Sequence, residues 1–259
     1  MTDFTEADLR GSHFQDVHLG GAVFRTVTFE GARLSEVDLS GVRIRGAWLR
    51  DLELSGEVDG LTVNGVDVGP FVAAELDRRY PERVARRTGD ADGFRRAWAI
   101  LERSWESTVE RARALPEELL HERVDDEWSF IETLRHLVFC TDAWLLRALL
   151  GHPSPYSPLD LPHDEMPDLP GVPRDRGARP SLEEVLALRA DRAASVREVM
   201  AALTDERLEA TTEPVLEPGY PESESFPVRR CLQAVVDEES LHRQFAERDL
   251  DVLERRRTG

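Results

Sequence analysis

The hydrophobic positions of the first 56 residues recur every five residues. One series, from Phe4 to Leu54, places Phe, Leu or Ile at every fifth position without interruption. A second series of small or apolar residues, from Thr2 to Leu52, lies two positions earlier in each repeat. A helix repeats every 3.6 residues and a strand every two, so neither explains the pattern. A square coil does, because each pentapeptide forms one side, with two residues pointing inward and three outward.

The repeats Ala7-Asp8-Leu9-Arg10-Gly11 and Val37-Asp38-Leu39-Ser40-Gly41 resemble those of the pentapeptide-repeat family. The resemblance implies a short right-handed quadrilateral β-helix of roughly three coils. A solenoid this short leaves apolar end faces, so we expect it to pack against the rest of the chain or, in a homodimer, against a second copy. Some family members are acidic mimics of duplex DNA, but the outward arginines here favour a scaffold or docking role.

After residue 56 the period of five is lost. Turn signals at Asn64-Gly65 and Gly69-Pro70 end the repeat region, and residues 71–80 predict a short amphipathic helix. The polar stretch 83–93 predicts a linker. The expected division is therefore a repeat domain over 1–69, a helical connector over 70–92 and a second domain over 93–259.

The second domain shows the periodicity of helices. Ser129 with Glu132 and Ser181 with Glu184 form capping boxes that open two of them. The predicted long helices are 94–115, 129–150, 181–203 and 228–258. Four long helices favour a four-helix bundle, and we expect an antiparallel one, so the whole chain combines a β and an α domain.

Glu238 and His242 are four residues apart in the last predicted helix, so they share a face. Leu241 is expected on that apolar face, with Ser240 and Arg243 on other sides. A carboxylate facing a core is costly unless it is paired, either with a metal ion or with a buried Arg or His. His136, also inside a long helix, is either an ordinary core histidine or a third ligand from a facing helix.

Residues 127–137, and residues 237–243 with 246–250, resemble the second and last helices of the DinB superfamily. Many members bind a divalent metal through three histidines. The mycothiol-dependent maleylpyruvate isomerases resemble this chain more closely there and use His, Glu and His. The resemblance implies His136, Glu238 and His242 as ligands, favours zinc or nickel over iron, and implies mycothiol as a co-substrate.

Three protein ligands leave a zinc ion an open position. The resemblance then implies a thiol S-transferase or thiol-dependent isomerase, whose partners are a small-molecule thiol and a small electrophile. The alternatives are a metal-dependent hydrolase, iron–oxygen chemistry at a two-His–carboxylate set, and a non-enzymatic scaffold or interaction protein with a structural metal. Tyr156 and His163, in a proline-rich segment, either line the pocket mouth or are ordinary loop residues. Three carboxylates are open candidates for orienting a ligand histidine: Glu132, Asp237 and Glu239.

The charge and residue composition of the chain limit the classes of partner that it is expected to bind. The 259 residues carry 51 acidic and 33 basic side chains, a net charge of −18, which argues against nucleic acid or an anionic membrane. Every basic residue is Arg, which indicates a GC-rich genome. The resemblance implies mycothiol as the thiol if that genome is actinobacterial. Cys140 and Cys231 lie inside predicted helices and indicate buried, reduced thiols of a cytoplasmic protein. The N-terminus shows no signal segment, and no uncharged run approaches membrane-spanning length.

Overall fold

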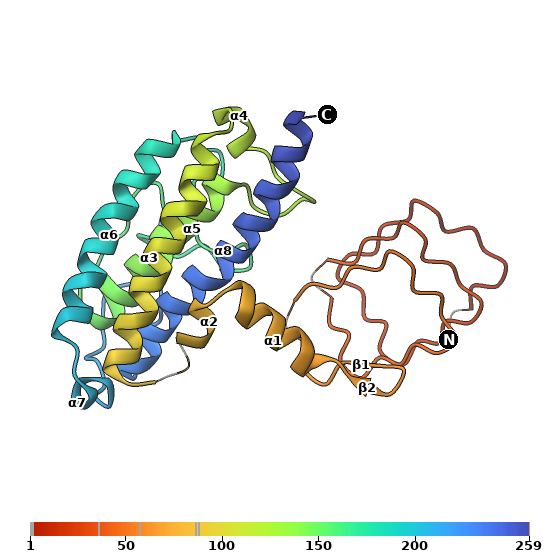
Figure 1. The fold of residues 1–259 in the computed structure, drawn as a ribbon, viewed down its shortest axis with the longest axis horizontal. Coiled ribbons are helices and arrows are strands. Elements are labelled where there is room, and N and C mark those ends of the chain that lie inside the picture. Colours follow the sequence, from red (N-terminus) through yellow and green to blue (C-terminus); the bar gives the residue numbers. More distant parts are fainter. Residues whose placement is uncertain (1–2, 36, 57, 86, 88, 259) are drawn as a thin grey trace. The chain divides into compact units, whose positions relative to one another are not determined.

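The computed structural model describes residues 3–258, apart from 36, 57, 86 and 88, and divides the chain into two compact units (Figure 1). The first unit holds residues 1–56 and the second residues 57–259. Within the described residues no helix is long and apolar enough to cross a membrane.

The backbone of the first unit turns a corner every five residues. Glycine corners such as Gly11 and Gly21, both with φ of 76°, alternate with non-glycine corners such as Asp16, with φ of 54°. Glycine suits this left-handed region because it has no Cβ. The glycine corners also close a turn, in which the N–H of Ser12 donates to the carbonyl of Leu9 at 3.1 Å. The chain path therefore follows the five-residue period of the sequence.

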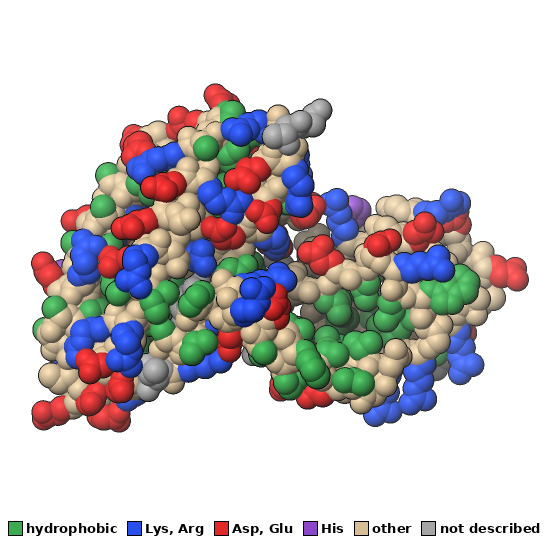
Figure 2. Space-filling model, in the orientation of Figure 1, with side chains coloured by type: hydrophobic (Ala, Val, Ile, Leu, Met, Phe, Trp, Pro, Cys, Tyr) green, Lys and Arg blue, Asp and Glu red, His purple; other side chains and the backbone are tan. Residues whose placement is uncertain are grey.

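The predicted quadrilateral β-helix is not shown. Between residues 3 and 56, position 36 aside, the structure contains no strand, and every residue it describes there is exposed. The series expected to point inward stays open, from 44% exposed at Leu9 to 68% at Phe4, and hydrophobic side chains show at the surface of this unit (Figure 2). A β-helix buries that series by stacking coils through hydrogen-bonded ladders. The backbone hydrogen bonds described here close single corners instead.

The second unit opens with a hairpin and two short helices. Strands β1 (Thr62–Val63) and β2 (Val66–Asp67) pair antiparallel across the turn predicted at Asn64-Gly65. Helix α1 (Gly69–Arg79) follows, and α2 (Glu82–Ala85) contacts the first long helix.

The four long helices of the second unit are α3 (Ala91–Arg113), α5 (Phe130–Thr141), α6 (Leu182–Ala202) and α8 (Val228–Thr258), and they pack side by side (Figure 1). A π-helical segment, η2 (Asp142–Leu149), continues α5, and α4 (Glu117–Leu120) and α7 (Asp205–Leu208) are single turns. These elements confirm the predicted helical bundle. Both predicted capping boxes are present: Ser129 and Ser181 each accept from the backbone three residues on and are bonded in return.

The expected antiparallel arrangement is wrong for two neighbouring pairs. Helices α3 and α8 run parallel: Arg111, near the end of α3, bonds Glu254 near the end of α8, and Arg229 at the start of α8 bonds Gly89 just before α3. Helices α5 and α6 also run parallel, because the connection over residues 150–181 returns along the bundle before α6 begins (Figure 1). The buried guanidinium of Arg135 on α5 holds this connection by donating to three of its carbonyls.

The buried stripe of α8 is wider than predicted. Ser240 is fully buried and Arg243 is 8% exposed, although both were expected on outer sides of the helix, whereas Leu241 is 45% exposed. The reason is that α8 contacts α3 on one side and α5 with η2 on another, so the helix is covered over two faces.

Candidate metal centre

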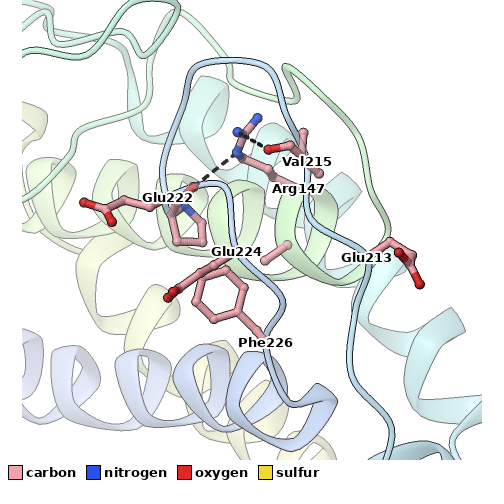
Figure 3. Close-up of a pocket in the computed structure, with 8 residues that line it drawn as sticks. Arg147, Glu213, Val215, Glu222, Glu224 and Phe226 are labelled. Atoms are coloured by element: carbon pink, nitrogen blue, oxygen red, sulfur yellow. Dashed lines mark hydrogen bonds between the residues drawn. The ribbon is translucent and has the colours of Figure 1, made fainter.

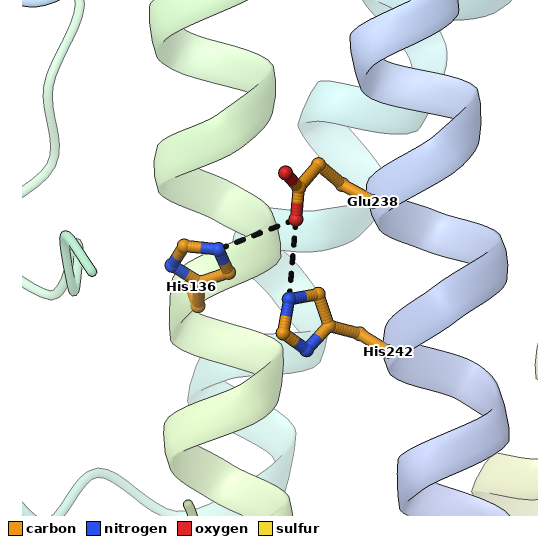
Figure 4. A group of neighbouring side chains, drawn as sticks. All are labelled: His136, Glu238 and His242. Atoms are coloured by element: carbon orange, nitrogen blue, oxygen red, sulfur yellow. Dashed lines mark ion pairs between the residues drawn. The ribbon is translucent and has the colours of Figure 1, made fainter. Parts of the chain in front are cut away.

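Three side chains from two helices converge between α5 and α8. His136 projects from α5, and Glu238 and His242 project from successive turns of α8 (Figure 4). One ligand atom from each lies within 4.8 Å of the others. Oε2 of Glu238 is 3.5 Å from Nε2 of His136 and 3.1 Å from Nε2 of His242. Ligands about 2.0 Å from a tetrahedral ion lie about 3.3 Å apart, so the two separations from Glu238 fit a bound divalent cation.

The orientation of His136 is set by the backbone. Its Nδ1 donates to the carbonyl of Leu161 at 2.9 Å, since a carbonyl can only accept. In a neutral ring Nε2 then presents a lone pair toward the Glu238 carboxylate. Two lone pairs facing each other repel unless a proton or a metal ion lies between them, so this pair of atoms suits either a proton that Nε2 donates to the carboxylate or a bound cation.

Glu238 is ionised in this setting. Burial would raise its pKa, but hydrogen bonds to His136 and His242 outweigh the burial and hold the pKa well below the ordinary value. The side chain of Glu238 is 35% exposed, compared with 6% for His136 and 14% for His242. The centre is therefore closed on the α5 side and open to solvent at Glu238.

Aromatic rings surround the two histidines, and of these rings only Phe245 was expected from the sequence, on the helix face of His242. The ring of Trp128 lies 4.5 Å from that of His136 and 5.9 Å from that of His242, measured between centroids. Phe139 packs against His136 and Phe245 against His242. The only sequence signal that places Trp128 near the start of α5 is that it directly precedes the capping box at Ser129.

Cys140 is a second neighbour that the sequence did not assign to the site. It lies one turn after His136 on α5, is 5% exposed, and places its Sγ 3.2 Å from Nε2 of His136. Burial, together with the negative charge of Glu238, raises the pKa of the Cys140 thiol well above its ordinary value. The sequence prediction of buried, free thiols is confirmed for both cysteines.

The two residues predicted at the pocket mouth lie one layer outside the centre. The hydroxyl of Tyr156 donates to the carbonyl of Tyr220 at 2.6 Å, and its ring stacks on Phe139. The ring of His163 packs edge-on against Tyr220, which in turn stacks on Phe139. Both residues thus reach the centre only through intervening aromatic rings, and their predicted role in substrate binding stays a prediction.

The three carboxylates considered for orienting a ligand histidine make other contacts. Glu239 is 4% exposed and accepts from Arg189 on α6 at 2.8 Å. Glu132 closes its capping box and pairs with Arg123, and Asp237 accepts from Gln233. The Leu161 carbonyl takes the orienting role, which side-chain patterns could not indicate.

One of a pair of buried carboxyls, that of Asp160, belongs to the segment that carries Leu161. Asp142 is fully buried and receives two hydrogen bonds from Arg192, at 2.7 and 2.8 Å. Asp160, also fully buried, lies beside it. Burial, and the charge of Asp142, raise the pKa of Asp160 to about 9, so Asp160 holds a proton at neutral pH.

Two concavities lie apart from the three donors. A small depression in the segment before α8 is lined by Arg147, Glu213 and Phe226 among others (Figure 3). Arg147 donates there to the carbonyls of Pro153 and Glu217 at 2.6 and 2.5 Å. A groove of about 400 Å³ follows α3 and α6 and is lined by Trp98, Trp105 and other residues. Neither contains His136, Glu238 or His242 in its lining.

The fold and the donor set together define a helical bundle with a candidate metal centre between two of its helices. A family model of the DinB superfamily matches residues 100–246, more than half of the chain, so the chain belongs to the DinB superfamily. This superfamily is metal-binding and includes metal-dependent enzymes. A model of pentapeptide repeats matches residues 2–41 in eight copies. No curated protein and no solved structure matches the chain.

Proposed function

We propose that the chain is a metal-dependent thiol S-transferase, or a related thiol-dependent isomerase, acting on a small electrophile. The observation that carries the proposal is the convergence of His136, Glu238 and His242 within 4.8 Å, in a bundle of the DinB superfamily. The donor set of two imidazoles and one carboxylate suits zinc or nickel.

His136, Glu238 and His242 would hold a divalent ion, whose charge would lower the pKa of a bound thiol and make the thiol a nucleophile at neutral pH. Glu238 contributes a full negative charge, because its pKa is lowered, and the Leu161 carbonyl keeps Nε2 of His136 directed at the centre. The rings of Trp128 and Phe139 pack against His136 on the buried side.

The side of the centre at Glu238 is exposed to solvent, so the thiol and the electrophile would both enter there. There the thiol sulfur bonds to the electrophilic carbon, the leaving group departs with the electrons of its bond, and the thiol proton is released to solvent. Mycothiol is the thiol favoured by the resemblance and by the arginine-only composition.

The test measures loss of an electrophilic aryl chloride in the presence of mycothiol, with the full chain loaded with zinc. We expect the zinc-loaded chain to accelerate the reaction well above the uncatalysed rate. The chelator-treated chain and the His242→Ala variant should lose that acceleration.

The hydrolase alternative is tested in parallel, by measuring hydrolysis of ester and amide substrates in the absence of thiol. Hydrolysis that depends on zinc but not on thiol would replace the transferase proposal with a hydrolase. A chain that binds zinc and accelerates neither reaction would leave the non-enzymatic alternative.

A further inference from the structure

Cys140 is a soft donor that the bundle places beside two of the three predicted ligands, His136 and Glu238. It lies one helical turn from His136, so both side chains leave the same face of α5. Its Sγ is 3.2 Å from Nε2 of His136, the same nitrogen that faces Glu238. In a tetrahedral site with bonds of about 2.0 Å to nitrogen and about 2.3 Å to sulfur, these two atoms would be about 3.5 Å apart.

The partner of this thiol depends on what occupies the centre. Without a metal ion, the S–H can donate to the lone pair of His136 Nε2, because Nδ1 is the atom that donates to Leu161. When a cation takes that lone pair, the nitrogen can no longer accept. The buried thiol, which is 5% exposed, then loses this partner, and its other polar neighbour is the carboxylate of Glu238, which is itself a predicted ligand of the same centre.

We propose that Cys140 is a fourth protein ligand of the metal centre and gives the site its preference for zinc. Binding replaces the thiol proton with a sulfur–metal bond, and the proton leaves to solvent. Soft thiolate ligands favour zinc over iron, manganese or magnesium. This inference rests on the metal site of the proposed function. It refines that function, because a substrate thiol must then enter as an added fifth ligand or in exchange for Cys140.

Cys231 provides a matched control. It is the other cysteine of the chain, is fully buried, and lies on α8 in a hydrophobic cluster with Leu232 and Val235 rather than in the centre. Replacing it changes the thiol content of the protein by the same amount without touching the three donors.

The experiment titrates the metal-free full chain with Co²⁺ and records its absorption spectrum. We expect visible d–d bands of a tetrahedral ion, together with a near-ultraviolet sulfur-to-cobalt charge-transfer band. The charge-transfer band should vanish in Cys140→Ser and in Cys140→Ala and should persist in Cys231→Ala. Affinity for Zn²⁺ should fall about tenfold or more in both Cys140 variants, since even outer partners of metal ligands contribute that much.

The outcomes separate this inference from the proposed function. Intense d–d bands without a charge-transfer band, or a charge-transfer band that survives both Cys140 variants, would overturn the role of Cys140 and leave the three-donor site standing. Absence of any cobalt spectrum in the wild-type chain would overturn the metal site itself, and the Cys140 ligand with it. Circular dichroism of each variant, matched to wild type, shows that the helices remain folded.

Discussion

The repeat region leaves its patterned hydrophobic residues exposed, whereas the helical bundle buries them. The repeat region has the stricter pattern, yet its apolar series remains 44–68% exposed, from Leu9 to Phe4. The bundle has a looser pattern, yet residues such as Leu134 and Leu250 are fully buried. A pattern along the chain fixes where the backbone bends, but burial needs neighbouring segments that cover the side chains. The bundle supplies those neighbours, and the site exists only because α5 and α8 face each other.

The same contrast holds for charges. In the repeat region, Arg10 and Asp8 pair at 2.6 Å with side chains that are 91% and 61% exposed. In the bundle, Arg189 and Glu239 pair at 2.8 Å with side chains that are 15% and 5% exposed. Water screens the first pair and not the second, so only the second is expected to matter for folding.

The largest difference between the regions should appear on truncation of a leucine. Leu134→Ala should lower the free energy of unfolding by about 2–5 kcal/mol, because it opens a cavity in the bundle core. Leu39→Ala, at a position that is 48% exposed, should change it by less than about 0.5 kcal/mol. Scanning calorimetry on the full chain measures both. Equal losses would contradict the contrast and would show that the repeats bury their apolar series in solution.

Removal of one arginine from each region tests the contrast in charge. Arg189→Ala should cost about 3 kcal/mol, because it leaves the buried Glu239 carboxylate unpaired. Arg10→Ala should give no measurable change, and that variant is the matched control. The readout is urea unfolding followed by circular dichroism. If the Arg189→Ala variant has the same urea midpoint of unfolding as the wild type, Glu239 has found another partner.

The buried carboxyl of Asp160 should impose a pH dependence that no exposed carboxyl shows. Its pKa is about 9 when folded, raised above the unfolded value of roughly 3.9, so unfolding releases a proton between these limits. The stability contributed by this group therefore falls as pH rises, by roughly 1 kcal/mol per pH unit between pH 6 and 8. Asp160→Asn should remove this slope. Urea unfolding of both proteins, repeated across that range, measures the difference.

Asp8→Asn is the control for that measurement. A hydrogen bond from Arg10 lowers the pKa of Asp8, so Asp8 is ionised in both folded and unfolded chains above pH 6, and its replacement should leave the slope unchanged. Wild-type and Asp160→Asn profiles that run parallel would show that Asp160 is not held protonated by the fold.

Local signals in the sequence predicted most of the bundle. The capping boxes at Ser129 and Ser181 placed two helix starts, and the run without Gly or Pro placed α8 from Val228 to Thr258. Spacing on one helix put Glu238 and His242 on a common face. What could not be predicted depends on tertiary packing, because the Leu161 carbonyl and the Asp160 carboxyl come from an irregular connection with no periodicity of its own.

The role of Cys140 also could not be predicted from the sequence alone. Its spacing from His136 is visible in the sequence, but a buried cysteine in a helix is usually a small core residue. Only the direction of the α5 face toward α8 distinguishes Cys140 from Cys231. The β-helix prediction for the repeat region failed for the converse reason. The five-residue period was evident in the sequence, but no sequence signal indicates whether successive coils stack.

Zinc content of the purified full chain tests the central claim most directly. Each protein is loaded with Zn²⁺, desalted and measured by elemental analysis. One variant lacks the bundle histidines, His136→Ala with His242→Ala. Its control lacks the exposed repeat histidines, His13→Ala with His18→Ala. We expect near-stoichiometric zinc in the wild type and the repeat variant, and almost none in the bundle variant. Zinc that is retained after loss of His136 and His242 would contradict the account.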